Sequence, residues 1–224
     1  MEFIQSFHKR WVQFVLLVWL CLFSCFNLSL ASQSIAPKVD ENDWLRLFDG
    51  KSLQNWHVSN FGGEGEVYVE DGQVILEMGA NLTGITWTGE FPQMDYEVIL
   101  EAMRVEGSDF FCGMTFPVGP APCSLITGGW GGTVVGLSSI DGRDASENET
   151  SQLMNFNAKQ WYRIRLRVTA PKIEAWIDEK QVINLLTRSH KISIRPEVEL
   201  SRPFGIASWR TKAALRNIKM RWIR

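Results

Sequence analysis

Carboxylates and one tryptophan are the side chains of this 224-residue chain that could do chemistry together. Two carboxyl groups held about 5 to 9 Å apart can share acid and base work on a glycosidic bond, and an aromatic ring can stack on the sugar. The candidate acids are Glu97, Glu101, Asp109, Asp141 and Asp144. This combination of residue types points to carbohydrate chemistry.

Trp130 differs from the other tryptophans because it lies in a glycine-rich segment rather than in an alternating strand. Six of the 18 glycines fall between Gly128 and Gly142. Glycine weakens a strand, so this cluster indicates tight bends or a backbone that another group approaches closely. It is either a turn-rich rim of a β-structure or a shallow binding surface with Trp130 as its stacking platform. We expect Trp44 and Trp222, by contrast, in the core.

Other catalytic and cofactor-binding patterns are absent from the sequence. His57 and His190 lie outside any HExxH, HxH or His-Cys spacing, so no zinc site is predicted. There is no nucleophile elbow, phosphate-binding loop or dinucleotide fingerprint. Asp141, Asp144 and Glu147 could offer oxygen ligands to calcium, but their spacing is not that of an EF-hand, and a solvated acidic loop is the simpler interpretation. We therefore expect no cofactor, with calcium as the minor alternative.

The elements that must position these residues are short β-strands. Within Glu66–Glu77, Asp71 and Gly72 supply the two positive φ angles of a type I′ turn, which predicts a hairpin. The turn fixes a register in which paired residue numbers sum to 143, so that Val69 faces Val74. About a dozen short strands follow one another, and no helix-length stretch after the leader repeats apolar residues at helical spacing. The pattern predicts an all-β sandwich or barrel.

A second hairpin is predicted for Trp161–Asp178, with paired residue numbers that sum to 341. One of its faces is apolar throughout. The other face pairs Arg167 with Glu174 and Arg165 with Trp176, and such neighbours contribute roughly 0.2 to 1 kcal/mol each. This ladder fixes the register and needs no ligand to explain it.

The long alternating strand Asp95–Val105 carries Glu97 and Glu101 on one face and small or apolar residues on the other. From the residues alone, these two carboxylates are interpreted as part of a solvated sheet face with salt bridges.

Cys112 and Cys123 lie on the two arms of a further predicted hairpin. If its turn is Pro117–Pro122, paired numbers sum to 239, which places Cys112 opposite Thr127 and Cys123 opposite Phe116. The two cysteines are then not directly paired, which disfavours a disulfide between them. We expect two buried thiols, with a disulfide formed on export as the alternative.

Residues 1–31 predict a secretory signal peptide, with a basic start, an apolar run over 12–22 and a small-residue cleavage signature at 29–31. The apolar stretch 11–30 could just span a bilayer, so a retained membrane anchor is the main alternative. Residues 22–25 faintly resemble a lipoprotein box. We expect a periplasmic or secreted protein that contacts the membrane only if the leader is retained.

Residues 32–43 are expected to form a flexible lead-in segment, and residues 44–224 are long enough to bury the core of one domain. The net charge of −2 provides no basic field for a nucleic acid. The expected partner is a saccharide.

The segment Leu47–Trp56, LFDGKSLQNW, resembles the opening of the 3-keto-disaccharide hydrolase domain family. Later stretches resemble the same family in the same order: Glu101–Arg104, WYRIRLRV with IEAWID, and Leu215–Ile218. Together they extend from Trp44 to Ile223. The resemblance implies a concanavalin-like jelly roll of two packed antiparallel sheets.

The chain departs from the family pattern in two segments. Where members usually have GxNSGIxxR, Gly107–Pro117 lacks the asparagine, serine and arginine, and a GLQxHG segment is replaced by Gly205–Arg210. The residues that replace much of the polar site are Phe110, Phe111, Cys112 and Trp209. The chain therefore resembles a divergent member.

The resemblance implies a glycosidase for 3-keto sugars, in which the C3 ketone makes the C2 proton acidic and elimination is followed by hydration. We assign the C2 base to Glu101 or Asp141, and expect both to share a cleft with Trp130. The residues assigned to substrate binding are Trp130, Arg104, Asp109 and Arg143. The alternatives are a non-catalytic, lectin-like sugar-binding module and a structural surface domain.

Overall fold

The computed structural model describes Asp40 and residues 42–223. The predicted leader, residues 1–31, and most of the predicted lead-in segment lie outside the described residues. Among the residues that are described, no helix is long and apolar enough to cross a membrane.

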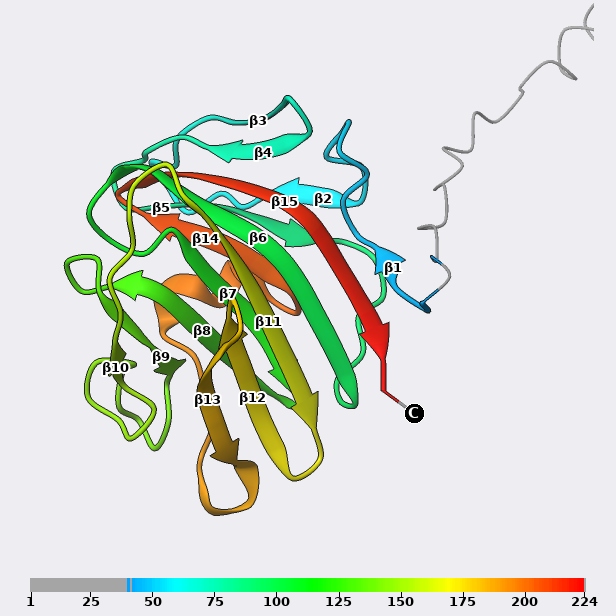
Figure 1. Ribbon diagram of the computed structural model, residues 1–224, viewed down its shortest axis with the longest axis vertical. Helices are drawn as coiled ribbons and strands as arrows, with labels where there is room; N and C mark the ends of the chain where they lie inside the picture. Colours follow the sequence, from blue (N-terminus) through cyan, green and yellow to red (C-terminus); the bar gives the residue numbers. More distant parts are fainter. Residues whose placement is uncertain (1–39, 41, 224) are drawn as a thin grey trace, which may run out of the picture. The chain divides into compact units, whose positions relative to one another are not determined.

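Two antiparallel sheets pack face to face (Figure 1). The eight-stranded sheet has the order β13 (Lys180–Leu186), β12 (Lys172–Ile177), β11 (Trp161–Thr169), β6 (Tyr96–Gly107), β15 (Thr211–Trp222), β4 (Gln73–Leu76), β3 (Val67–Glu70), and β1 (Leu45–Arg46) also pairs with β15. The seven-stranded sheet has the order β10 (Gln152–Leu153), β9 (Val134–Ser138), β8 (Ala121–Gly129), β7 (Cys112–Val118), β14 (Gly205–Trp209), β5 (Leu82–Trp87), β2 (Trp56–Val58). The predicted all-β jelly-roll sandwich is confirmed.

Helical structure in the described residues is limited to two short 3₁₀ segments, η1 (Thr187–Ser189) and η2 (Pro196–Ser201). Both belong to the connection between β13 and β14. The expectation that no long helix follows the lead-in segment is therefore confirmed.

The three predicted hairpin registers are confirmed. Val69 pairs with Val74 in the β3–β4 hairpin, and Arg165 pairs with Trp176 in the β11–β12 hairpin. Cys112 faces Thr127 in the β7–β8 hairpin. The position of the turn and the alternation of the side chains together set which residues face each other, because a slip of one residue would move every side chain to the opposite face.

The core lies between the two sheets and takes up alternate residues of both. Trp56 and Trp87 are its tryptophans, with ring centroids 5.2 Å apart. The expectation that Trp44 and Trp222 fill the core is wrong. Trp222 is the last residue of β15 and is 54% exposed, and the half-buried Trp44 lies against the guanidinium of Arg221.

The outer face of the eight-stranded sheet carries the expected salt bridges. The carboxylate of Glu97 lies 2.6 Å from Nη2 of Arg221 and 3.6 Å from Nη1 of Arg165. Glu97 is not solvated, however, because these two arginines cover it and leave it 3% exposed. Glu101 pairs with Arg216, whose Nη2 lies 2.6 Å from Oε2 of the carboxylate.

Cys112 and Cys123 are free, buried thiols, as expected. Burial raises the pKa of each to about 12, so neither forms the reactive thiolate at ordinary pH. We expect a thiol reagent to label neither cysteine in the folded protein and both after unfolding in urea, as read by peptide mass mapping. Labelling of either one under native conditions, at the rate of a free thiol, would contradict this burial.

Candidate functional site

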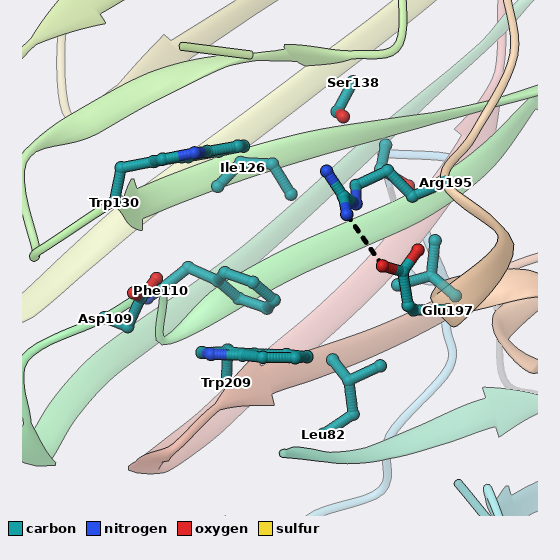
Figure 2. Close-up of a pocket in the computed structure, with 11 residues that line it drawn as sticks. Leu82, Asp109, Phe110, Ile126, Trp130, Ser138, Arg195, Glu197 and Trp209 are labelled. Carbon is teal, nitrogen blue, oxygen red and sulfur yellow. Dashed lines mark hydrogen bonds and ion pairs between the residues drawn. The ribbon is translucent and has the colours of Figure 1, made fainter. Parts of the chain in front are cut away.

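A cavity of about 300 Å³ opens on the outer face of the seven-stranded sheet (Figure 2). The residues that line this aromatic pocket are Leu82, Asp109, Phe110, Ser124, Ile126, Trp130, Ser138, Arg195, Glu197, Val198 and Trp209. Strand alternation creates this surface, because Ser124 and Ile126 of β8 face the pocket while Cys123 and Leu125 pack into the core.

Three aromatic side chains give the pocket its apolar walls. Phe110 precedes β7 and Trp209 ends β14, with ring centroids 6.4 Å apart. Trp130 lies on the other side of Phe110 from Trp209, as Figure 2 shows. Leu82 of β5 pairs directly with Trp209 and extends this wall. The resulting surface suits a ligand with flat apolar faces.

The glycine-rich loop that presents Trp130 is fixed from behind by Arg104. Nη2 of Arg104 donates to the carbonyls of Gly132 at 2.8 Å and Gly128 at 3.2 Å, and Nη1 donates to that of Phe156 at 3.4 Å. A Cβ on Gly128 would lie 2.6 Å from Nη2 of Arg104, and Gly128 has a φ of +76°. Gly132 has a φ of +104° and its added Cβ would lie 3.2 Å from the same Nη2, so the close approach of the guanidinium and the positive φ angles account for the glycines at 128 and 132.

Trp130 itself has a φ of 47°, in the left-handed region that bulky residues rarely adopt. Its side chain is 42% exposed, so burial does not compensate for the strained backbone. A backbone conformation of this kind costs about 1 to 3 kcal/mol, and such residues cluster at ligand sites. This backbone conformation places the indole at the rim of the pocket.

The remaining wall comes from residues 190–198, here called the strap, which begin directly after η1, include the first turn of η2 and run beside residues 139–141. Ser139 and Ser193 exchange backbone hydrogen bonds of 2.6 and 3.0 Å. Asp141 N–H donates to Lys191 at 2.8 Å. These contacts bring Arg195, Glu197 and Val198 to the pocket, although every other lining residue except Trp209 comes much earlier in the sequence.

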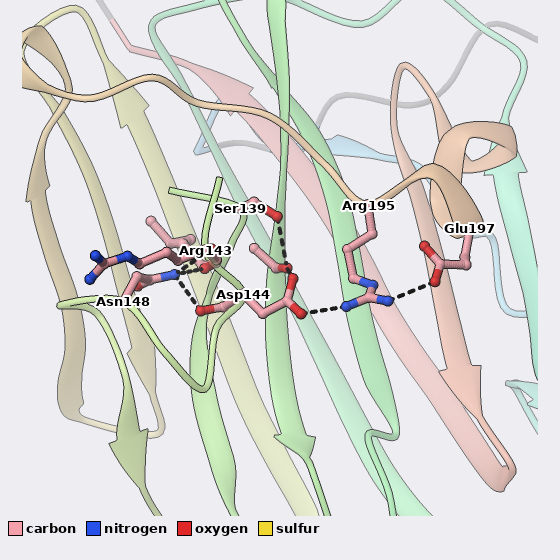
Figure 3. Close-up of polar contacts among 8 residues, drawn as sticks. Ser139, Arg143, Asp144, Asn148, Arg195 and Glu197 are labelled. Carbon is pink, nitrogen blue, oxygen red and sulfur yellow. Dashed lines mark hydrogen bonds and ion pairs between the residues drawn. The ribbon is translucent and has the colours of Figure 1, made fainter. Parts of the chain in front are cut away.

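Arg195 lies between two carboxylates (Figure 3). Its Nη1 bonds Asp144, and its Nη2 donates to Oε1 of Glu197 at 2.7 Å. Asn148 fixes the loop that carries Asp144 by donating to the carbonyls of Leu137 and Asp144, both at 2.7 Å. The bond from Arg195 holds the pKa of Glu197 below its usual value, and the bond to Glu197 raises the pKa of Arg195. Glu197 and Arg195 therefore stay ionised.

Asp109 stands at the opposite end of the pocket from Arg195 and Glu197 (Figure 2). Its Oδ1 accepts a hydrogen bond of 2.7 Å from Phe110 N–H. Its Oδ2 has no hydrogen-bond donor among the described residues. Asp109 is thus the one pocket carboxylate in the described chain that no cation pairs with.

The structure does not bring Glu101, Asp141 and Trp130 into one cleft. Glu101 lies on the outer face of the other sheet, where Arg216 and Asn217 bind its carboxylate at 2.7 and 3.0 Å. Strand alternation had placed it correctly on an outward face, but the two outward faces of a sandwich point in opposite directions.

Asp141 lies beside the strap and outside the aromatic pocket. Its carboxylate bonds His190 at 2.8 Å and Lys191 N–H at 2.7 Å, and the bond from His190 lowers its pKa. Nδ1 of His190 faces Asp141 while its Nε2 lies 2.9 Å from Glu149. Asp141 thereby helps to attach the strap.

Among the other predicted site residues, Asp109 and Trp130 line the pocket, and Arg104 and Arg143 do not. Arg104 is 6% exposed, and burial lowers its pKa. Arg143 lies exposed in the acidic loop. In the described part of the chain, no three His, Cys, Asp or Glu side chains are placed to hold a metal ion, so Asp141, Asp144 and Glu147 do not converge on calcium.

Residues 43–221 match the model of the 3-keto-alpha-glucoside-1,2-lyase-like domain family. The chain belongs to this family. No curated protein matches the chain. Within this lyase-like domain, the aromatic pocket contains Phe110 and Trp209, two of the residues in the segments that depart from the family pattern. Phe111 and Cys112, from the same segments, are buried in the core.

Solved structures with the same fold include carbohydrate-related proteins. A protein from Parabacteroides distasonis assigned to the glycosyl hydrolases is 14% identical, with a TM-score of 0.54 over 84% of this lyase-like chain and 99% of its own. The Crh5 transglycosylase in complex with NAG is 11% identical, with a TM-score of 0.56, and the match covers 81% of this chain and 84% of the transglycosylase. The Emp46p carbohydrate recognition domain is 15% identical, with a TM-score of 0.50, and the match covers 82% of this chain and 98% of that domain. The fold thus occurs in both carbohydrate-active and carbohydrate-binding proteins.

The sequence analysis missed the strap residues of the aromatic pocket. Arg195 is 51 positions from Asp144 and lies in a segment without a regular pattern, so no local signal identifies it. Phe110 and Trp209 did carry a signal, because they replace polar residues of the family pattern. Aromatic residues at those positions mark the pocket wall.

Proposed function

We propose that the protein binds a saccharide in the aromatic pocket. The observation that carries this proposal is the gathering of Phe110, Trp130 and Trp209 around one cavity, with Asp109 at one end and Arg195 and Glu197 at the other. Sugar rings have flat apolar faces and a polar edge, so they suit aromatic walls with polar groups at the ends. The volume of about 300 Å³ has room for roughly one or two sugar rings.

Membership of the lyase-like family and the strained presentation of Trp130 both support this function. A tryptophan held in an unfavourable backbone conformation at a pocket rim needs a reason other than stability, and ligand stacking supplies it. The signal-like residues 1–31 support export, so we propose that binding takes place in the periplasm or outside the cell.

A second candidate function is elimination from a 3-keto saccharide, and the unpaired carboxylate of Asp109 favours it. In this reaction Asp109 takes the proton from C2, the C1–O bond breaks, and the proton passes to the oxygen of the leaving sugar, which restores the carboxylate. Water then adds across the new C1–C2 double bond. Glu101 and Asp141 lie outside the pocket, so Asp109 takes over the role of base. This function requires one free base only.

Hydrolysis by a pair of carboxylates has less support. It needs one carboxyl group that is protonated to act as the acid. Glu197 is the second carboxylate of the pocket, and its bond to Arg195 lowers its pKa, which keeps it ionised. It therefore cannot serve as the proton donor while Arg195 holds it.

The substitution Asp109→Asn separates binding from catalysis. We expect binding of neutral disaccharides, measured by calorimetry, to change by less than about threefold, because the amide keeps the size of the carboxylate. If Asp109 is the base, release of products from 3-keto disaccharides should fall by a factor of about 10² to 10⁴.

Asp71→Asn is the matched control, since Asp71 lies in the exposed β3–β4 turn at a φ of 49° that asparagine tolerates. Turnover by the wild type that survives in Asp109→Asn would place the base elsewhere. Absence of binding to every saccharide in a broad panel would refute the proposed function.

A further inference from the structure

The charged residues that line the aromatic pocket carry more negative than positive charge. Asp109 and Glu197 contribute two carboxylates, and Arg195 is the one lining cation in the described part of the chain. Asp144 adds a third carboxylate, bonded directly to Arg195 just outside the lining. A ligand in the pocket therefore faces more negative than positive charge.

Both ends of the Arg195 guanidinium are already occupied. Nη1 bonds Asp144, whose Oδ1 accepts from Ser138 Oγ at 3.4 Å, and Nη2 donates to Glu197 at 2.7 Å. A guanidinium recognises a ligand carboxylate by presenting two parallel N–H groups. In Arg195, one N–H of Nη1 and one N–H of Nη2 already donate to protein carboxylates. Its remaining hydrogens suit single hydrogen bonds to neutral hydroxyl groups.

Two further arginines lie near the pocket without lining it. Arg104 is buried and donates to three backbone carbonyls. Arg210 has its guanidinium 5.5 Å from the Trp209 ring and donates to Ala80 and Asn81. Neither presents a free fork to a ligand in the pocket.

We propose that the aromatic pocket selects neutral saccharides over saccharides that carry a carboxylate, and that the clamp of Arg195 between Asp144 and Glu197 determines this selection. The inference rests on the proposed saccharide binding. A ligand carboxylate would meet like charge from Asp109 and Glu197 and would find no cation free to neutralise it. A neutral sugar needs only the aromatic walls and hydroxyl contacts.

The test compares pairs of disaccharides in the gluco and galacto series, each pair consisting of a neutral disaccharide and its C6-carboxylate counterpart. For the wild type we expect calorimetry to give an affinity at least about tenfold lower for the acidic member. Glu197→Gln removes one negative charge and loosens one end of Arg195. It should raise the ratio of the acidic to the neutral affinity about tenfold.

The matched control is Glu199→Gln, which makes the same change in charge two residues along η2. Glu199 pairs with Arg202 and does not line the pocket, so both affinities should remain as in the wild type. Equal affinity of the wild type for both members, or equal gains in the two variants, would overturn the role of the clamp. Acidic binding that disappears in Arg210→Gln would also overturn it. If no neutral disaccharide binds, the proposed function itself fails, and this outcome is distinct from loss of selectivity.

Discussion

Replacing Trp130 with glycine is expected to abolish most saccharide binding without destabilising the protein. The indole is a principal wall of the aromatic pocket, and losing an aromatic wall of this kind weakens binding by about 2 kcal/mol, or about 30-fold. Glycine adopts the φ of 47° without strain, while it adds freedom to the unfolded chain. These effects on stability oppose each other, so the free energy of unfolding should stay within about 1 kcal/mol of the wild type.

Calorimetry with a neutral disaccharide and urea unfolding measure the two effects separately. Trp222→Ala is the control, because Trp222 is also exposed but lies at the end of a strand in the other sheet. It should leave binding in the aromatic pocket unchanged. Unchanged binding by Trp130→Gly would show that the ligand lies elsewhere. A loss of stability above about 2 kcal/mol would show that the loop depends on the indole.

Replacing Arg104 with methionine is expected to lower the free energy of unfolding by about 3 kcal/mol and to weaken saccharide binding as well. Methionine keeps the apolar stem of the side chain but removes the guanidinium, and with it the donors to Gly128, Gly132 and Phe156. Buried carbonyls left without a partner cost roughly 1 to 3 kcal/mol each, reduced where water can reach them. The loop that carries Trp130 would lose its anchor.

Urea unfolding tests this expectation, with Arg163→Met as control. Arg163 is an exposed residue of β11, so its replacement should change stability by less than about 0.5 kcal/mol. Arg104→Lys retains a positive charge but not the two forked N–H donors of the guanidinium. Its free energy of unfolding should lie between those of Arg104→Met and the wild type. If Arg104→Met is as stable as the wild type and binds saccharide normally, Arg104 does not hold the loop.

Much of the fold could be predicted because the sequence signals that determine it, turn residues and strand alternation, are local. The pair Asp71 and Gly72 sets the β3–β4 register, and the alternation of charge and apolar residues in β11 and β12 sets the next one. The exception is the end of β15, where the exposed Trp222 was assigned to the core. Alternation indicates a face, but not whether the opposing sheet extends far enough to cover it.

The candidate site was less predictable because it is assembled from distant segments. Trp130 and Asp109 were identified by a glycine cluster and by residue type, and both line the pocket. Glu101 was wrongly grouped with them, since strand alternation cannot tell one outer face of a sandwich from the other. Arg195 reaches the pocket through backbone pairing of the strap with residues 139–141, which has no sequence pattern of its own.

The anchoring of the Trp130 loop by Arg104 makes the proposed binding surface depend on the docking of the two sheets. Arg104 belongs to the eight-stranded sheet, whereas the loop extends from β8 of the seven-stranded sheet. Neither sheet can present Trp130 correctly before the two have docked. A compact intermediate that keeps its strands but has lost fixed packing between the layers would give a β-sheet spectrum and bind no ligand. Saccharide affinity therefore reports interlayer docking, and it should be lost before backbone structure when the protein is destabilised.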